Sequence, residues 1–227
     1  MKTLSFKNFK VARQSRLFFD LDTEQDRVSF EPGLHLLLAP NGLGKSTFLQ
    51  ACSGLLADTQ GDLFFDGRTV TPASSVFYLS EYLTLPKFIT GEEWASSYGE
   101  ADLKWVNELR LNDVWKKYLG RMSQGERRKI MWLSAHFSKK SILFLDEPLD
   151  GLDLRAIDAA RGLINAWKAE GRVVLLVAHQ TGEIADLATQ AWVIENQKWA
   201  DWSSIFKTPF SGESASEVRT KLLGHYR

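Results

Sequence analysis

The sequence predicts an α/β fold built on a mainly parallel sheet. Short continuous apolar segments occur at 34–38, 76–79, 142–145, 173–178 and 191–194, and helical patterns separate them. Continuous apolar runs are typical of parallel strands that are covered on both faces, and strands that alternate with helices are joined by crossover connections. We therefore expect these segments to form one sheet with helices packed against it.

A small antiparallel sheet is expected at the edge of this fold. Residues 3–31 and 61–70 alternate apolar and polar side chains, as at 4–7 and 63–67. A period of two is typical of strands that have one buried and one solvated face.

A helical insertion follows the second apolar segment. From Tyr82 to about Ala135 there is no convincing strand, and apolar residues recur at helical intervals: Trp94, Trp105, Val106, Leu109, Leu111, Val114 and Trp115. We interpret the chain as a single domain over 1–227, with a core at 1–81 and 136–227 and a helical subdomain at 82–135.

Two further helices are expected towards the C-terminus. One covers 154–169, where an apolar stripe ends before Gly171, and one covers 212–223. The sequence does not indicate a role for residues 203–227. The stripe of the first helix consists of Ile157, Ala160, Ile164 and Trp167.

Composition excludes several classes of protein. The 227 residues are 44% hydrophobic, enough for a substantial core, and 28 basic residues balance 28 acidic ones, so no overall field favours nucleic acid. The single cysteine, Cys52, excludes an intrachain disulfide and fits a reducing compartment. No apolar run reaches the ~18 to 20 residues of a membrane span, and the first residues lack the apolar core of a signal peptide. We expect a cytoplasmic protein that binds no nucleic acid.

A glycine-rich loop follows the apolar segment 34–38 and precedes a helical pattern. It approximates G-x-x-x-x-G-K-[ST], with Ala39 in place of the first glycine, a change that requires φ below zero there. Backbone N–H groups of such a loop wrap phosphate oxygens, its lysine reaches the β/γ-phosphates, and its hydroxyl residue binds Mg²⁺. The residues expected to bind nucleotide here are Pro40, Asn41, Gly42, Leu43, Gly44, Lys45, Ser46 and Thr47, with Ser46 also at the metal.

Two carboxylates stand at the end of another apolar segment. Asp146 and Glu147 follow 142–145, and open α/β sheets place ligands at the carboxyl ends of their strands. Together with the glycine-rich loop, these residues predict a nucleoside triphosphate site.

A third motif narrows the interpretation. Residues 122–126, Met-Ser-Gln-Gly-Glu, open a helix expected to run from Arg127 to Phe137, and this stretch resembles the signature sequence of ATP-binding cassette (ABC) ATPases. The other elements of that family stand in order around it: the phosphate loop, the acidic strand end, the segment 149–153 and His179. The resemblance covers nearly the whole chain. It implies that two ATP molecules are sandwiched in a head-to-tail dimer, with each signature facing the phosphate loop of the other subunit.

The resemblance assigns roles by position. Asp146 would hold Mg²⁺ through its water shell, Glu147 would orient or deprotonate the attacking water, and His179 would contact the γ-phosphate. Ser123 and Gly125 would contact the ATP of the partner subunit, although Ser123 with Glu126 also fits a capping box. His179 also fits a strand-end histidine bonded to backbone, and Asp153 fits both a dimer contact and a helix N-cap.

Five positions depart from the family, Gln124 only mildly. Besides Ala39, Glu81 stands where the family usually has a Mg²⁺-touching glutamine, so we expect stronger Mg²⁺ dependence than in a Glu81→Gln variant. Arg13 takes the place of the aromatic residue that stacks on adenine, and its guanidinium can also stack. Glu126 replaces a glutamine, and its charge would repel phosphate unless it turns back to the helix cap. Other candidates for the stacking role are Phe9, Phe18 and Phe19, which also fit core positions.

The resemblance implies an ATP-hydrolysing subunit, dependent on ATP and Mg²⁺, that works at the cytoplasmic face of the inner or plasma membrane. Its partners would be a second ATPase subunit, identical or different, and a separately encoded membrane-spanning subunit. Residues 90–93 and 178–180 favour an export type, and Phe88, Ile89 and Trp94 lie where relatives grip the membrane subunit. Two alternatives remain: a soluble ABC ATPase serving an assembly such as an iron-sulfur scaffold, and a catalytically weak ATP-binding regulator. The sequence does not identify the transported substrate.

Overall fold

The computed structural model describes residues 2–80, 84–178, 182–210 and 214–226. Its larger sheet has six strands in the order β10-β9-β3-β8-β7-β6. All five apolar segments lie in this sheet and pair in parallel, whereas β10 pairs antiparallel with β9 and was not predicted. The strands are β3 (Gly33–Leu38), β6 (Val76–Leu79), β7 (Ile142–Asp146), β8 (Val173–Val177), β9 (Gln190–Glu195) and β10 (Lys198–Asp201).

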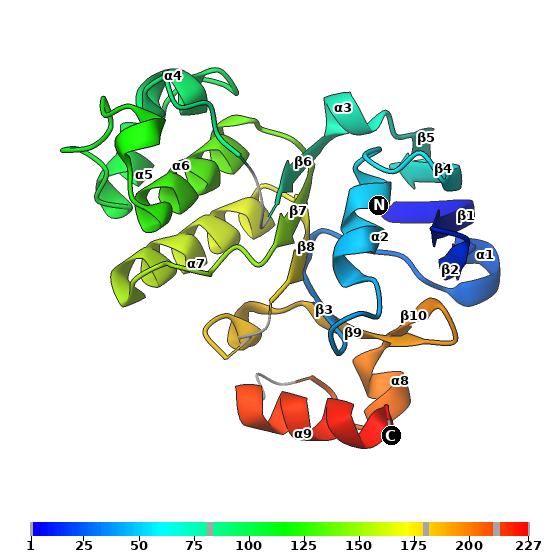
Figure 1. Cartoon of the computed structure of the whole chain (residues 1–227). Helices are drawn as coiled ribbons and strands as arrows, with labels where there is room; N and C mark the ends of the chain where they lie inside the picture. The colour runs from blue at the N-terminus through cyan, green and yellow to red at the C-terminus, as the bar shows by residue number, and fades with distance from the viewer. Residues whose placement is uncertain (1, 81–83, 179–181, 211–213, 227) are drawn as a thin grey trace.

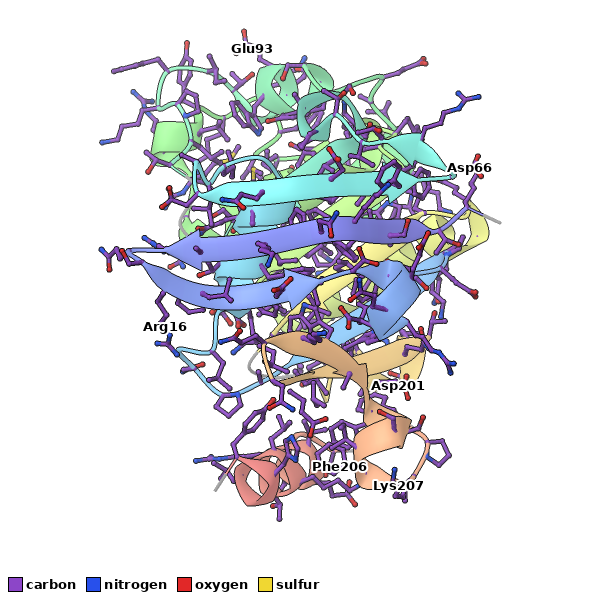
Figure 2. The ribbon with its side chains drawn as sticks, turned by 90° about the vertical axis from the view of Figure 1, so that its right-hand side faces the viewer. Arg16, Asp66, Glu93, Asp201, Phe206 and Lys207 are labelled. Atoms are coloured by element: carbon purple, nitrogen blue, oxygen red, sulfur yellow. The ribbon has the colours of Figure 1, made fainter. Side chains whose placement is uncertain are left out.

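The expected antiparallel sheet is present, with four strands in the order β2-β1-β4-β5. Figure 2 views its face and places Arg16 at the end where β1 turns into β2. The prediction of strands throughout 3–31 was wrong at Thr23–Asp26, which form the short helix α1 because the Asp22 carboxylate caps the N–H of Glu24. The strands are β1 (Leu4–Arg13), β2 (Arg16–Leu21), β4 (Thr59–Phe65) and β5 (Arg68–Thr69).

The six-stranded sheet is buried on both faces, as its apolar strands require. Alternate residues of β7 enter different clusters: Leu143 and Leu145 pack with α6 and α7, while Ile142 and Phe144 pack with α2 and the small sheet. Figure 1 shows α2 between the two sheets and α6 with α7 on the opposite side. Consequently, the phosphate-loop helix and the signature helix cover opposite faces of one sheet.

The helices agree closely with the sequence pattern. α6 begins at Gln124 rather than Arg127, since Ser123 caps it, and the expected C-terminal helix runs from Ala215 to His225. No described helix is both long and apolar enough to cross a membrane. The helices are α2 (Lys45–Cys52), α3 (Pro72–Ser75), α4 (Gly91–Ser96), α5 (Leu103–Glu108), α6 (Gln124–Phe137), α7 (Leu154–Ala169), α8 (Trp202–Phe206) and α9 (Ala215–His225), with 3₁₀ turns at Leu119–Arg121 and Ala185–Leu187.

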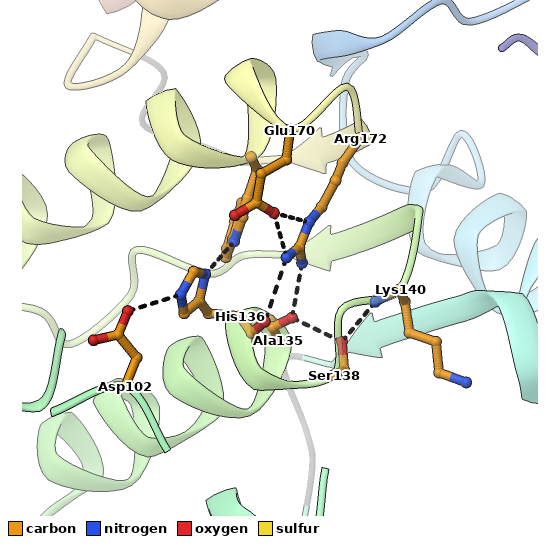
Figure 3. Close-up of polar contacts among 8 residues, drawn as sticks. Asp102, Ala135, His136, Ser138, Lys140, Glu170 and Arg172 are labelled. Atoms are coloured by element: carbon orange, nitrogen blue, oxygen red, sulfur yellow. Dashed lines mark hydrogen bonds and ion pairs between the residues drawn. The ribbon is translucent and has the colours of Figure 1, made fainter. Parts of the chain in front are cut away.

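A buried polar network joins α5, α6 and α7 (Figure 3). His136 Nδ1 accepts from Trp167 Nε1 at 3.2 Å, and His136 Nε2 lies 3.6 Å from the carboxylate of Asp102, the N-cap of α5. Arg172 pairs with Glu170 and donates to the carbonyls of Ala135 and His136. The C-terminal end of α6 is therefore tied to α7 by the side chain of Trp167, and to the segment after α7 by the side chain of Arg172.

Candidate functional site

The glycine-rich loop joins β3 to α2 and has the backbone that phosphate binding requires. Gly42 and Gly44 adopt φ of 82° and 96°, which L side chains rarely adopt, whereas Ala39 stays outside the left-handed region. The replacement of the first glycine by alanine is therefore compatible with this loop. The N-terminus of α2 follows directly at Lys45, and such a terminus attracts anions.

Lys45 is buried against its own loop. Its Nζ donates to the carbonyl oxygens of Ala39 at 2.7 Å and Pro40 at 3.2 Å. Burial lowers the pKa of Lys45, and the carboxylates of Glu147 and Asp146 oppose that shift. The ammonium thus lies at the base of the loop, close to both acidic residues.

Ser46 and Asp146 meet although one hundred positions separate them. Ser46 Oγ donates to Asp146 Oδ1 at 2.9 Å, and Asp146 is 2% exposed. A hydroxyl beside a carboxylate is an oxygen-only donor set, which suits Mg²⁺ bound by a few protein groups, waters and substrate phosphates. The described residues contain no group of three or more His, Cys, Asp or Glu that could hold a metal by themselves.

Glu147 lines the cavity above the loop. Its side chain is nearly buried, its φ is 48°, and its N–H donates to the carbonyl of Val177 at 2.9 Å. The cavity holds about 510 Å³, enough for a nucleotide-sized ligand. Its lining is formed by Arg13, Gln14, Phe18, Asn41, Gly42, Gly44, Lys45, Ser46, Thr47 and Glu147.

The residues expected to stack on the base lie in two different environments. Arg13 and Phe18 line the cavity, and the Phe18 ring packs against Gly44 so closely that a Cβ there would lie 2.5 Å from it. Phe9 and Phe19 are buried in the core. Phe18 therefore joins Arg13 as a candidate for contact with a nucleobase.

Leu43 and Phe18 also line a second cavity of about 570 Å³ that extends to the β9–β10 turn and to His225 and Tyr226 at the end of α9. Among the described residues that line this second cavity, Leu43 is the one that belongs to the expected loop 40–47. The carbonyl of Pro40 accepts a hydrogen bond from Lys45. Residues of the loop therefore line both cavities, and Phe18 is shared between them.

The signature segment is a complete capping box. Ser123 Oγ accepts from the Glu126 N–H at 3.1 Å, and the Glu126 carboxylate accepts from the Ser123 N–H at 2.6 Å. Lys117 Nζ lies 3.1 Å from the same carboxylate. Burial alone would raise the pKa of Glu126, but the Ser123 N–H and Lys117 together lower it. The charge of Glu126 is therefore turned back to the cap and paired.

Gly125 lies against the loop after β7. A Cβ on Gly125 would come within 2.7 Å of the carbonyl oxygen of Gly151, so only glycine fits there. Among the described residues, none from α6 lines the phosphate-loop cavity. Asp153 caps α7 by accepting from Ala156 and pairs with Lys129 of α6 at 3.0 Å, which confirms its N-cap interpretation.

Two expected site residues, Glu81 and His179, lie outside the described residues. The sequence did not predict another residue at the site, Tyr78, whose hydroxyl donates to Asp146 Oδ2 at 3.0 Å. Tyr78 belongs to no sequence motif, so its contact with Asp146 could be predicted only with knowledge that β6 pairs with β7.

The comparison with family models decides the assignment. A model described as ABC transporter matches residues 25–150, which include the phosphate loop, the signature segment and the acidic strand end. The chain belongs to the ABC transporter family. Within this family it is an ATP-binding subunit, and its fold is that of the ABC ATPases.

Curated relatives in the ABC family resemble the chain over most of its length. The aliphatic sulfonates import ATP-binding protein SsuB of Bacillus thuringiensis subsp. konkukian is 26% identical over 206 residues, covering 84% of this chain and 82% of the relative. The lantibiotic transport ATP-binding protein SrtF of Streptococcus pyogenes is 26% identical over 164 residues, covering 68% and 72%.

Solved structures support the ABC fold. An ATP-binding subunit of an ABC transporter superposes with a TM-score of 0.78 at 23% identity, covering 97% of this chain and 99% of that one. A bacterial Atm1-family ABC exporter with ATP bound gives a TM-score of 0.75 at 17% identity, covering 97% of this chain and 42% of the exporter.

Proposed function

We propose that this ABC subunit hydrolyses ATP with Mg²⁺ to drive a transporter. The contact between Ser46 and Asp146 carries the proposal, because it joins the phosphate loop to the acidic strand end at one cavity. Loop N–H groups and Lys45 bind the β- and γ-phosphates, and Ser46 and Asp146 would hold Mg²⁺, which would neutralise phosphate charge.

Glu147 acts on the attacking water. Its carboxylate lines the same cavity as the loop, so it can orient a water molecule towards the γ-phosphorus and accept its proton. The bond from phosphorus to the water oxygen forms as the bond to the ADP oxygen breaks, and the products are ADP and phosphate. Lys45 remains on the phosphates throughout. For His179 we propose a contact with the γ-phosphate, and for Glu81 a contact with Mg²⁺.

A second ATPase subunit completes each site. Ser123 caps α6 and Gly125 lies in its first turn, and neither lines the cavity of the described chain, so we propose that they contact ATP held by the partner in a head-to-tail dimer. The N-terminus of α6 favours an anion. Because Glu126 pairs with Lys117, its carboxylate repels a phosphate at this position less strongly.

The remaining partner is a separately encoded membrane subunit, with this chain on its cytoplasmic face. We further propose that 82–135 is a helical subdomain beside the core and that transport is of the export type. Residues 90–93 and 178–180 support the export type. In the former, Thr90 and Glu93 form a capping box and Gly91 packs against Met122 and Ile130, so this motif also has a packing role.

ATP turnover tests the proposal. Purified wild type should release phosphate from ATP only with Mg²⁺, and Glu147→Gln should bind ATP but lose turnover by about a thousandfold. Glu108→Gln, an exposed carboxylate on α5, is the matched control and should match wild type. Undiminished turnover in Glu147→Gln contradicts the assigned role, and absence of ATP binding in wild type contradicts the function.

A pull-down tests the partner. Tagged Glu147→Gln protein with ATP and Mg²⁺ should recover a multi-spanning membrane protein from detergent-solubilised source cells. Recovery of soluble scaffolds only would favour a soluble assembly ATPase. ATP binding without turnover in wild type would favour a regulator.

A further inference from the structure

A tyrosine on the neighbouring strand holds the carboxylate at the metal site. The Tyr78 hydroxyl donates to Asp146 Oδ2 at 3.0 Å, while the Ser46 hydroxyl donates to Asp146 Oδ1 at 2.9 Å. One donor comes from β6 and the other from the first turn of α2. Each oxygen of the carboxylate is thus engaged by a hydroxyl from a different element.

The register of the sheet explains this contact. β6 and β7 pair in parallel with Tyr78 opposite Phe144, and residues two apart on a strand share a face. Asp146 therefore lies on the same face of the sheet as Tyr78 and Phe144, two residues further towards the carboxyl end of β7 than Phe144. Tyr78 packs against the cluster beneath α2, and its long phenol spans this offset. A shorter side chain at position 78 would not place a donor at Asp146.

The hydroxyl is suited to donate. A tyrosine hydroxyl keeps its proton at neutral pH, and the Tyr78 hydroxyl lies within hydrogen-bond distance of the carboxylate, so it can donate to Asp146. Asp146 is 2% exposed, so water does not replace a lost donor easily. With a donor on each oxygen, the carboxylate cannot turn about its Cβ–Cγ bond without breaking both bonds.

We propose that Tyr78 is a positioning residue for the Mg²⁺ site of this ATPase. Its hydroxyl fixes the plane of the Asp146 carboxylate so that Oδ1 stays beside Ser46, with which it would hold Mg²⁺. The inference rests on the proposed function, and it assigns to Tyr78 no contact with ATP. Groups that orient metal-binding carboxylates in this way commonly change metal affinity about 10- to 100-fold when they are removed.

The test separates metal binding from folding and from nucleotide binding. Tyr78→Phe keeps the ring and removes only the hydroxyl. ATP affinity is measured by calorimetry in EDTA and at increasing Mg²⁺, and the melting temperature is recorded. We expect ATP affinity in EDTA to stay within about twofold of wild type, and the Mg²⁺ concentration for half-maximal effect to rise about tenfold. Tyr98→Phe, which removes a hydroxyl from an exposed ring in edge-to-face contact with Phe77 and Trp94, is the control and should leave both quantities unchanged.

A double variant tests whether Tyr78 acts through Asp146. In an Asp146→Ala background, which has no side-chain acceptor for the Tyr78 hydroxyl, Tyr78→Phe should produce no further shift in the remaining Mg²⁺ dependence. An additional tenfold shift there overturns the inference. So does an equal loss of ATP affinity with Mg²⁺ and with EDTA, which indicates a structural role.

The two proposals fail differently. Wild type that binds ATP with a clear Mg²⁺ dependence, together with an unshifted Tyr78→Phe curve, overturns the role of Tyr78 and leaves the ATPase assignment standing. Wild type that binds no ATP under either condition overturns the proposed function and this inference with it.

Discussion

The indole of Trp132 stacks on the indole of Trp167, with ring centroids 5.4 Å apart and planes 6° from parallel. Trp132 belongs to the signature helix α6 and Trp167 to α7, and both rings are fully buried. Trp132 Nε1 also donates to the carbonyl of Pro148 at 2.9 Å. The signature helix is thereby fixed to the residue that follows Asp146 and Glu147.

Removal of that hydrogen bond should destabilise the fold. Trp132→Phe keeps an aromatic ring but leaves the buried Pro148 carbonyl without this donor. We expect the free energy of unfolding, measured in urea, to fall about 1–2 kcal/mol more than in Trp202→Phe. Trp202 is the matched control, because its Nε1 is buried with no hydrogen-bond partner in the described chain. Equal losses in the two variants would show that the bond to Pro148 contributes nothing.

The pairing of Glu126 with Lys117 should support the closed dimer. In a Glu147→Gln background with ATP and Mg²⁺, Lys117→Gln uncovers the charge of Glu126 near the proposed site for the partner's phosphates. We expect the protein concentration needed for dimerisation, measured by analytical ultracentrifugation, to rise about two- to fivefold. Adding Glu126→Gln should restore it. Failure of this second change to restore dimerisation would exclude the charge as the cause.

The ring of Phe18 should contribute to binding of the base. Phe18→Ala removes an aromatic face from the cavity, and base stacking of about 1–3 kcal/mol corresponds to a loss of ATP affinity of roughly 10- to 100-fold. Tripolyphosphate has no base, so its affinity should change far less in equilibrium dialysis. A comparable loss for both ligands would mean that Phe18 acts through its packing on Gly44. Leu17→Ala, at the partly exposed neighbour of Phe18, is the control.

His35 should make the fold sensitive to acid. Its Nε2 donates to the carbonyl of Glu31 and its Nδ1 accepts from Trp192, while burial lowers its pKa from 6.5 to about 4. Because the folded pKa lies below the unfolded one, the unfolded chain takes up the proton first as pH falls. The stability that His35 contributes is therefore complete above about pH 6.5 and is lost progressively towards pH 4.

Urea unfolding at pH 7.5 and pH 5.0 checks this linkage. We expect His35 to account for a fall of about 2 kcal/mol in wild type between these two values. His35→Gln can keep both hydrogen bonds without titrating, so its free energy of unfolding should depend less on pH by that amount. An equal pH dependence in wild type and variant would rule out His35 as the titrating group.

The sequence was sufficient for the strands whose apolar runs are continuous and for the helix that a capping box opens. The short strand β10 escaped because only Trp199 is fully buried in its four residues, and its existence depends on pairing with β9. Likewise, two adjacent phenylalanines at 18 and 19 must face opposite sides of β2, but the pattern alone does not say which one faces the cavity.

The site was predictable where its residues are adjacent in sequence and unpredictable where strand order brings them together. The loop 40–47 and the pair Asp146 and Glu147 are motifs in their own right. The contact from Tyr78 to Asp146 requires that β6 lie beside β7, a tertiary fact that no local pattern contains. The capping box predicted that Glu126 could turn away from phosphate, but not that Lys117 would pair with it.

Lys129, Trp132 and His136 tie α6 to α7 and to the loop after β7, so the helix and these neighbours would turn together as one lever about the C-terminal end of α6. The bonds of His136 and Arg172 hold that end against α7 and the segment after it, whereas Ser123 caps the opposite end, fourteen helical residues away. At about 1.5 Å per residue the arm is roughly 20 Å long, so a rotation of about 10° around the anchored end would carry the Ser123 hydroxyl about 3.5 Å. A shift of one hydrogen-bond length at the signature thus needs only a small turn where the helix is fixed.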